Sequence, residues 1–82
     1  MSITVELTDA EAIRACSAIK ASVEKMRKYC IETDEQFGDM NDIYRDAISD
    51  NKRCHEKIVA ALELRGYKTV EHIENDPIDE WR

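Results

Sequence analysis

The stretch "EQFGD" (residues 35–39) decides the predicted fold, because it ends one long helical pattern and begins another. The chain of 82 residues has only two glycines, Gly38 and Gly66, and each follows a run with helical periodicity. Glycine ends helices readily because it reaches the left-handed conformation at little steric cost, and Asp39 suits the N-cap of a following helix. We therefore predict an all-α antiparallel hairpin, with helices over residues 9–37 and 40–65.

The first helix has a start signal and one apolar row. Thr8 is the expected N-cap, and Glu11, three residues later, can accept a hydrogen bond from the Thr8 amide. Small and apolar side chains then recur at alternating spacings of three and four residues, which places them along one face of a helix. We call such a row a seam; its members here are Ala12, Cys16, Ile19, Val23, Met26, Cys30, Thr33 and Phe37.

The second helix has a similar seam, which predicts the residues that face the first helix. Its members are Met40, Tyr44, Ala47, Asn51, Cys54, Ile58 and Ala61. Asn51 has two interpretations: a buried asparagine that fixes the register of an oligomer, or a side chain at the seam edge that reaches water.

A second position for the turn competes with Gly38. Residues 33–36 (Thr-Asp-Glu-Gln) also form a capping box, which would move the turn about one helical turn earlier. The Gly38 turn sets Ile19 opposite Ile58 and Val23 opposite Cys54, whereas the earlier turn sets Cys16 opposite Cys54. We prefer the Gly38 turn because it gives the glycine a role.

The two ends complete a single domain. Residues 1–7 alternate like a short strand with no sheet to join, so we expect an extended arm. The tail, residues 67–82, has apolar anchors and two signals for short helical turns, at Thr69 and at Asp76-Pro77. We expect the tail to fold back over the open end of the hairpin.

Composition and charge limit the classes of function. The net charge of −6 disfavours generic nucleic-acid binding, and three cysteines without CxxC spacing indicate reduced thiols. No segment has the ~20 apolar residues that cross a bilayer, and the N-terminus lacks a basic and then apolar leader. We therefore expect a cytoplasmic protein that binds neither membrane nor nucleic acid directly.

The segment "NKRCHEK" (residues 51–57) is the one place that suggests reactive or metal chemistry. Adjacent helical residues point about 100° apart, so Cys54, His55 and Glu56 cannot converge on one ion or substrate. No second ligand follows one turn later, since Val59 stands where HExxH needs a histidine. We expect Cys54 on the seam, His55 at its boundary and Glu56 in solvent, and hence no catalytic, metal or cofactor site and no enzyme activity.

Apolar residues beside the seams widen the apolar face beyond what one neighbouring helix covers. A second copy would cover them by forming a four-helix bundle with two-fold symmetry. The sequence thus predicts a homodimer, with an interface formed by Ile31, Ile43, Ile48, Val59 and Leu62.

Charge falls into zones along the expected hairpin. The acidic zone, at the turn, is a candidate docking surface for a basic protein and comprises Glu32, Asp34, Glu35, Asp39 and Asp42. The basic waist, at mid-helix, is a candidate anion site and comprises Lys25, Arg27, Lys28, Tyr29, Lys52 and Arg53. The tail acids are expected at the open end. The alternative for all these charges is a solvated surface with weak ion pairs.

The leading functional prediction is a non-enzymatic protein that binds and modulates another macromolecule. Its small size, acidity and helical pattern are typical of inhibitors and accessory regulators of nucleic-acid-processing proteins, of the kind encoded by phages or mobile elements. Two alternatives remain: a homo-oligomer that sequesters a nucleotide or other phosphate ligand on the basic waist, and a structural assembly subunit.

Overall fold

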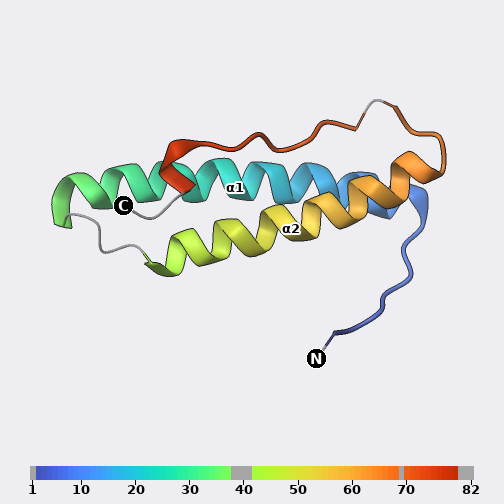
Figure 1. Ribbon diagram of the computed structural model, residues 1–82, viewed down its shortest axis with the longest axis horizontal. Coiled ribbons are helices and arrows are strands. Elements are labelled where there is room, and N and C mark those ends of the chain that lie inside the picture. Colours follow the sequence, from blue (N-terminus) through green and yellow to red (C-terminus); the bar gives the residue numbers. More distant parts are fainter. Residues whose placement is uncertain (1, 38–41, 69, 80–82) are drawn as a thin grey trace.

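The computed structural model describes residues 2–37, 42–68 and 70–79, and shows two long helices packed antiparallel (Figure 1). Helix α1 spans Asp9–Phe37, helix α2 spans Asp42–Leu64, and a single 3-10 turn, η1, spans Pro77–Asp79. These described ranges contain no strand. The sequence predicted helices over residues 9–37 and 40–65; α2 ends one residue earlier than predicted, and its predicted start at residue 40 lies outside the described residues.

Helix α1 begins with the capping box that the sequence predicted. The Thr8 amide donates to Glu11 Oε1 at 2.9 Å, and the Glu11 amide donates to Thr8 Oγ1 at 3.2 Å. The hydrogen bond from the Thr8 amide holds the pKa of Glu11 below its ordinary value. Two amides that the helix leaves without internal partners are thereby satisfied.

The earlier of the two turn positions is not the one adopted. Helix α1 continues through residues 33–36 to Phe37. Thr33 Oγ1 donates to the Tyr29 carbonyl, four residues back, at 2.8 Å, as a residue inside a helix does. The connection therefore lies within residues 38–41, which include Gly38, Asp39 and Met40 and are outside the described residues.

Gly66 ends α2 and reverses the chain. Its φ of 92° lies in the left-handed region. The Tyr67 amide donates to the Leu62 carbonyl at 3.2 Å and the Gly66 amide to the Glu63 carbonyl at 3.0 Å, the pair of bonds that defines a Schellman cap. Tyr67 packs against the cluster that contains Leu62, as such caps commonly do.

The tail runs along the hairpin, in the same direction as α1 (Figure 1). Tyr67 and Val70 pack on a first core cluster, formed by Ala12, Cys16, Val59 and Leu62. Further along, Ile73 and Ile78 pack on a second cluster, formed by Val23, Cys30 and Ile48. The tail was expected to fold back over the open end of the hairpin; its apolar anchors also carry it further along, to the second cluster.

The tail shows one of its two expected turns. Asp76 caps η1, since the Ile78 amide donates to Asp76 Oδ1 at 3.0 Å. Residues 70–76 form no helix, and Thr69 lies outside the described residues.

The buried row of α2 differs from the predicted seam. The buried residues are Arg45, Ile48, His55, Val59 and Leu62, whereas Tyr44 is 39% exposed and Cys54 and Ala61 are exposed. The tail causes this difference, because α2 must bury the side that faces both α1 and the tail. Cys54, expected opposite Val23, therefore points to solvent, and Val23 packs with Cys30 and Ile48.

The same shift affects residues that were expected to interact with a second copy. Ile48, Val59 and Leu62 are at most 2% exposed within one chain, so they form its core and offer no surface to a partner. Asn51 is half-buried and donates to the Ala47 carbonyl at 2.7 Å, so its own helix satisfies it.

Candidate functional site

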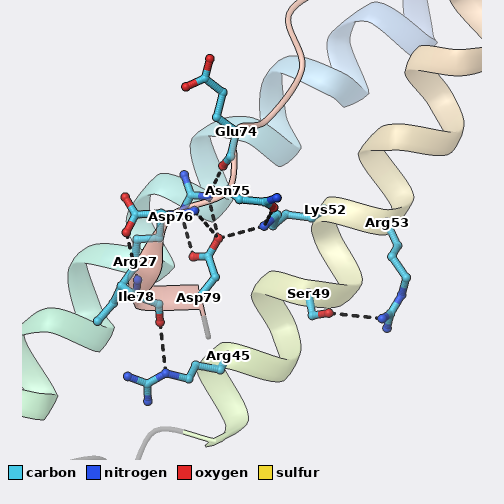
Figure 2. A network of polar contacts seen from close by, with 10 residues as sticks. All are labelled: Arg27, Arg45, Ser49, Lys52, Arg53, Glu74, Asn75, Asp76, Ile78 and Asp79. Carbon is cyan, nitrogen blue, oxygen red and sulfur yellow. Dashed lines mark hydrogen bonds and ion pairs between the residues drawn. The ribbon is translucent and has the colours of Figure 1, made fainter. Parts of the chain in front are cut away.

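The most elaborate polar arrangement lies where the end of the tail crosses both helices. Arg27 Nε donates to Asp79 Oδ1 at 2.9 Å and Arg27 Nη2 to Asp79 Oδ2 at 2.7 Å, which makes a bidentate pair. Lys52 Nζ donates to the same Oδ2 at 3.0 Å (Figure 2). The carboxylate of Asp79 is 7% exposed and thus joins α1, α2 and η1 at one point.

Further hydrogen bonds fix the backbone of the tail at this point. Arg27 Nη2 donates to the Glu74 carbonyl at 2.7 Å, and Arg45 Nε donates to the Ile78 carbonyl at 3.1 Å. Lys52 Nζ also donates to Asn75 Oδ1 at 2.6 Å. We call this arrangement the clasp and define it as Arg27, Arg45, Lys52, Asn75 and Asp79.

The electrostatics of the clasp favour an ionised Asp79. Burial by itself would raise the pKa of Asp79, but the hydrogen bonds from Arg27 and Lys52 outweigh it and lower that pKa. The hydrogen bonding between Arg27 and Asp79 also raises the pKa of Arg27. The charges of the clasp therefore stabilise one another while largely shielded from water.

A second ion pair holds the middle of the tail. Lys20 donates to Glu71, and this hydrogen bond raises the pKa of Lys20 and lowers that of Glu71. Nearer the Schellman cap at Gly66, the Asp9 carboxylate accepts a hydrogen bond from the Tyr67 hydroxyl at 2.9 Å and forms an ion pair with Arg65 at 2.7 Å. The tail acids were expected at the open end, but Glu71 and Asp79 contact cations of α1 and α2 along the hairpin.

The structure brings together only part of the predicted basic waist. Arg27 and Lys52 meet at Asp79, while Lys25 and Lys28 are exposed and make no ion pair within the described part of the chain. Arg53 binds Asp50 and Ser49 on its own helix. The two central cations of the waist therefore already hold an anion, supplied by the tail.

The predicted acidic zone is described in part. Glu32 is exposed on α1, whereas Asp39 and the side chains of Asp34, Glu35 and Asp42 lie outside what the structure describes. Close to Glu32 in the chain, Tyr29 pairs with Tyr44 of α2, with ring centroids 6.0 Å apart. Their exposures are 41% and 39%, so both rings remain open to a partner.

Sequence reasoning missed this tyrosine pair. It assigned Tyr44 to the seam and Tyr29 to the anion site, and only the packing of the two helices brings the rings together. Of the expected interface residues, Ile31 is 48% exposed and Ile43 82% exposed.

The segment "NKRCHEK" has a different arrangement from the one predicted. His55 is 1% exposed and Cys54 is exposed, which reverses their expected positions. His55 Nδ1 is buried without a hydrogen-bond partner among the described residues, and burial lowers the pKa of this histidine. The signal for its burial was its heptad spacing from Ile48 and Leu62, seven residues on either side.

The side chain of Glu56 contacts the tail. Its carboxylate lies 3.1 Å from His72 Nδ1, and Glu63 lies 2.7 Å from His72 Nε2. Within the described residues, no group of three or more histidine, cysteine or acidic side chains is placed to hold a metal ion.

Comparisons with known proteins add no functional assignment. No protein-family model, curated protein or solved structure matches this chain. Among the described residues, neither helix combines the length and apolar character that a membrane span requires.

Proposed function

We propose that this protein acts by binding another macromolecule and modulating it, through a surface at the turn end of the hairpin. The observation that supports this proposal is the exposed pair of Tyr29 and Tyr44, one from each helix. We call this the turn-end surface and define it as Tyr29, Tyr44 and the acidic zone, of which the structure describes only the side chain of Glu32.

Its composition suits protein recognition. Tyrosine is enriched at the centres of protein interfaces because a large ring and a hydroxyl are offered at low conformational cost. Acidic side chains around such a centre accelerate the encounter with a basic partner and discriminate against acidic ones. The proposed partner is therefore a protein with a basic surface, such as the nucleic-acid-binding face of an enzyme or regulator.

Quantitative affinity capture tests this proposal. The immobilised protein is compared with a Tyr29→Ser, Tyr44→Ser variant and with a Glu32→Lys, Asp34→Lys, Glu35→Lys variant, with circular dichroism as the check on helicity. A control variant, Glu6→Lys with Glu74→Lys, reverses exposed acids away from the turn. We expect both turn-end variants to lose the captured basic protein and the control to retain it. Equal capture by all variants would contradict the proposal.

A second candidate function is supported by the clasp. Arg27 and Lys52 already bind a carboxylate, which is the kind of group that a phosphate can replace. In this alternative a nucleotide or other phosphate ligand displaces Asp79 and is sequestered on the basic waist. A nucleotide panel should then raise the melting temperature, and Lys25→Ala or Arg27→Ala should remove the shift. No shift with any nucleotide would eliminate this alternative.

A further inference from the structure

A second row of residues runs along α2, on the side away from its buried row. Its members alternate at spacings of four and three residues, so they lie above one another on the helix surface. We call this row the outer stripe; it comprises Ile43, Ala47, Asp50, Cys54, Lys57, Ala61 and Leu64. Ala47 is half-buried and the other six are exposed.

The two ends of the outer stripe are large apolar residues that are strongly exposed. Ile43 is 82% exposed and Leu64 is 90% exposed, the highest values among the large apolar side chains described on the two helices. Between these two side chains the stripe consists of three small uncharged residues, Ala47, Cys54 and Ala61, and of two charged ones, Asp50 and Lys57.

The outer stripe is complementary to itself when read in opposite directions. Outward from Cys54, Asp50 on one side corresponds to Lys57 on the other. Ala47 then corresponds to Ala61, and Ile43 to Leu64. Such an arrangement matches small with small, large with large, and acid with base.

We propose that α2 packs antiparallel against α2 of a second copy, around a two-fold axis that passes near Cys54. Asp50 then faces Lys57 of the second copy, and Ile43 faces its Leu64. Alanine at positions 47 and 61 lets the two helices approach closely. A two-fold axis makes each of these contacts twice, which is how isologous dimers form.

The charges favour this orientation over a parallel one. In a parallel pair Asp50 would face Asp50 and Lys57 would face Lys57, which is repulsive. Within the described residues Lys57 has no ion pair, and Asp50 pairs only with Arg53 of its own helix at the surface. Both side chains are therefore available to a second copy.

The N-terminal arm extends the same surface. A groove of about 320 Å³ lies between the arm and the C-terminal part of α2, and Val5, Leu7, Ile58 and Ala61 contribute to its walls. Lys57 and Ala61 of the outer stripe also line this groove, so it adjoins the end of the stripe to which the two-fold axis brings Ile43 of the second copy. The apolar part of its wall can receive that side chain.

This interface is distinct from the one proposed for the partner, because the outer stripe contains none of the residues of the turn-end surface. Ile43 lies between Asp42 and Tyr44 in the chain but belongs to the stripe alone. The interface along the stripe also replaces the predicted dimer interface, of which Ile43 alone is retained. A dimer without a captured partner would therefore refute only the proposed function, and capture by a monomer would refute only this inference.

Sedimentation equilibrium over the micromolar range measures the dissociation constant of the dimer. Asp50→Lys places a cation opposite Lys57 twice per dimer, so it should raise that constant by at least about tenfold. The double variant Asp50→Lys, Lys57→Asp exchanges the two charges and should restore dimerisation. Asp46→Lys, an exposed acid outside the stripe, is the matched control and should leave the constant unchanged.

Mild oxidation gives an independent test. Cys54 is exposed and close to the proposed axis, so it should form a disulfide with Cys54 of the second copy. Cys54→Ala should abolish this covalent dimer and preserve the non-covalent one. The inference is wrong if the protein is a monomer at all concentrations, if the exchanged pair fails to restore the dimer, or if oxidation joins Cys16 to Cys54 within one chain.

Discussion

Arg27 of α1 binds Asp79 of the tail through two parallel hydrogen bonds of 2.9 and 2.7 Å, across 52 positions of sequence. This pair fixes the end of a tail that is also held by four hydrophobic side chains, by the hydrogen bond from buried Arg45 to the Ile78 carbonyl and by the ion pair of Lys20 with Glu71. Because Lys52 shares the carboxylate, the loss of Asp79 affects α1, α2 and the tail together.

Asp79→Asn should destabilise the protein by about 2 kcal/mol, because it leaves two largely buried cations without their counter-charge. Urea unfolding followed by circular dichroism measures this change. Glu74→Gln is the matched control, since the Glu74 side chain is exposed and only its carbonyl takes part in the clasp. Equal stability of Asp79→Asn and the unaltered protein would show that the clasp contributes nothing.

Acid should weaken the same contact. The pKa of Asp79 is lower in the folded protein than its ordinary value of 3.8, so the unfolded chain binds its proton first. The stabilisation is complete above that ordinary value and is lost as the pH falls through the lower, folded value. Melting temperatures measured between neutral pH and strong acid should show this loss. In Asp79→Asn the part of the loss that comes from protonation of Asp79 should be absent.

His55→Leu should stabilise the protein by roughly 1 kcal/mol at neutral pH, because it replaces a buried polar ring whose Nδ1 has no hydrogen-bond partner among the residues that the structure describes. Burial lowers the pKa of His55 below 6.5, so the unfolded chain gains the proton first and stability falls as the pH drops below that value. His55→Leu should not show this decrease in stability at acid pH. Urea unfolding at several pH values measures both effects.

His72 is the control for that experiment, because its titration has the opposite sign. Hydrogen bonds to Glu56 and then Glu63 raise its pKa above 6.5, so its contribution is complete below that value and is lost as the pH rises through the folded pKa. His72→Gln should therefore leave the acid-side loss from His55 in place. If His72→Gln removes that loss, the assignment to His55 is wrong.

Gly66→Ala should lower the free energy of unfolding by about 1–2 kcal/mol, because the left-handed conformation that Gly66 adopts at φ 92° is unfavourable for alanine. Apart from Gly66 itself and its two chain neighbours, no heavy atom of the described residues lies within 4 Å of the position that the added methyl group would take, so the cost is one of backbone conformation. Thermal unfolding measures it. Alanine at Lys68, an exposed residue beyond the cap, is the control and should change little.

Thr8→Ala should destabilise α1 by about 1 kcal/mol, since it removes the acceptor of the Glu11 amide. Thr8→Ser keeps that acceptor and should recover most of the loss. Chemical denaturation of the two variants tests this, and equal stabilities would show that the capping box has no effect on the folded protein.

Much of the candidate site could not be predicted, although its residues were visible. The sequence singled out Arg27 and Lys52 as cations of one waist, but the anion that joins them lies far along the chain in the tail. It assigned Asp79 to the opposite end because charge was placed by position along a hairpin, without a path for the tail. The Tyr29–Tyr44 pair was missed for the same reason: it depends on how two helices are rotated.

Local patterns in the sequence determined the helices of this protein, the capping box at Thr8 and the glycine cap at Gly66, because each depends on residues within a few positions of one another. The seam of α1 was also determined in this way from Ala12 to Thr33, where its members are buried or half-buried; the side chain of Phe37 lies outside the described residues. The sequence left α2 with more than one apolar row, and periodicity alone does not choose between them. Tertiary structure made that choice: the tail packs beside α1, and α2 buries the row that contacts both of them at once, with His55 inside and Cys54 outside.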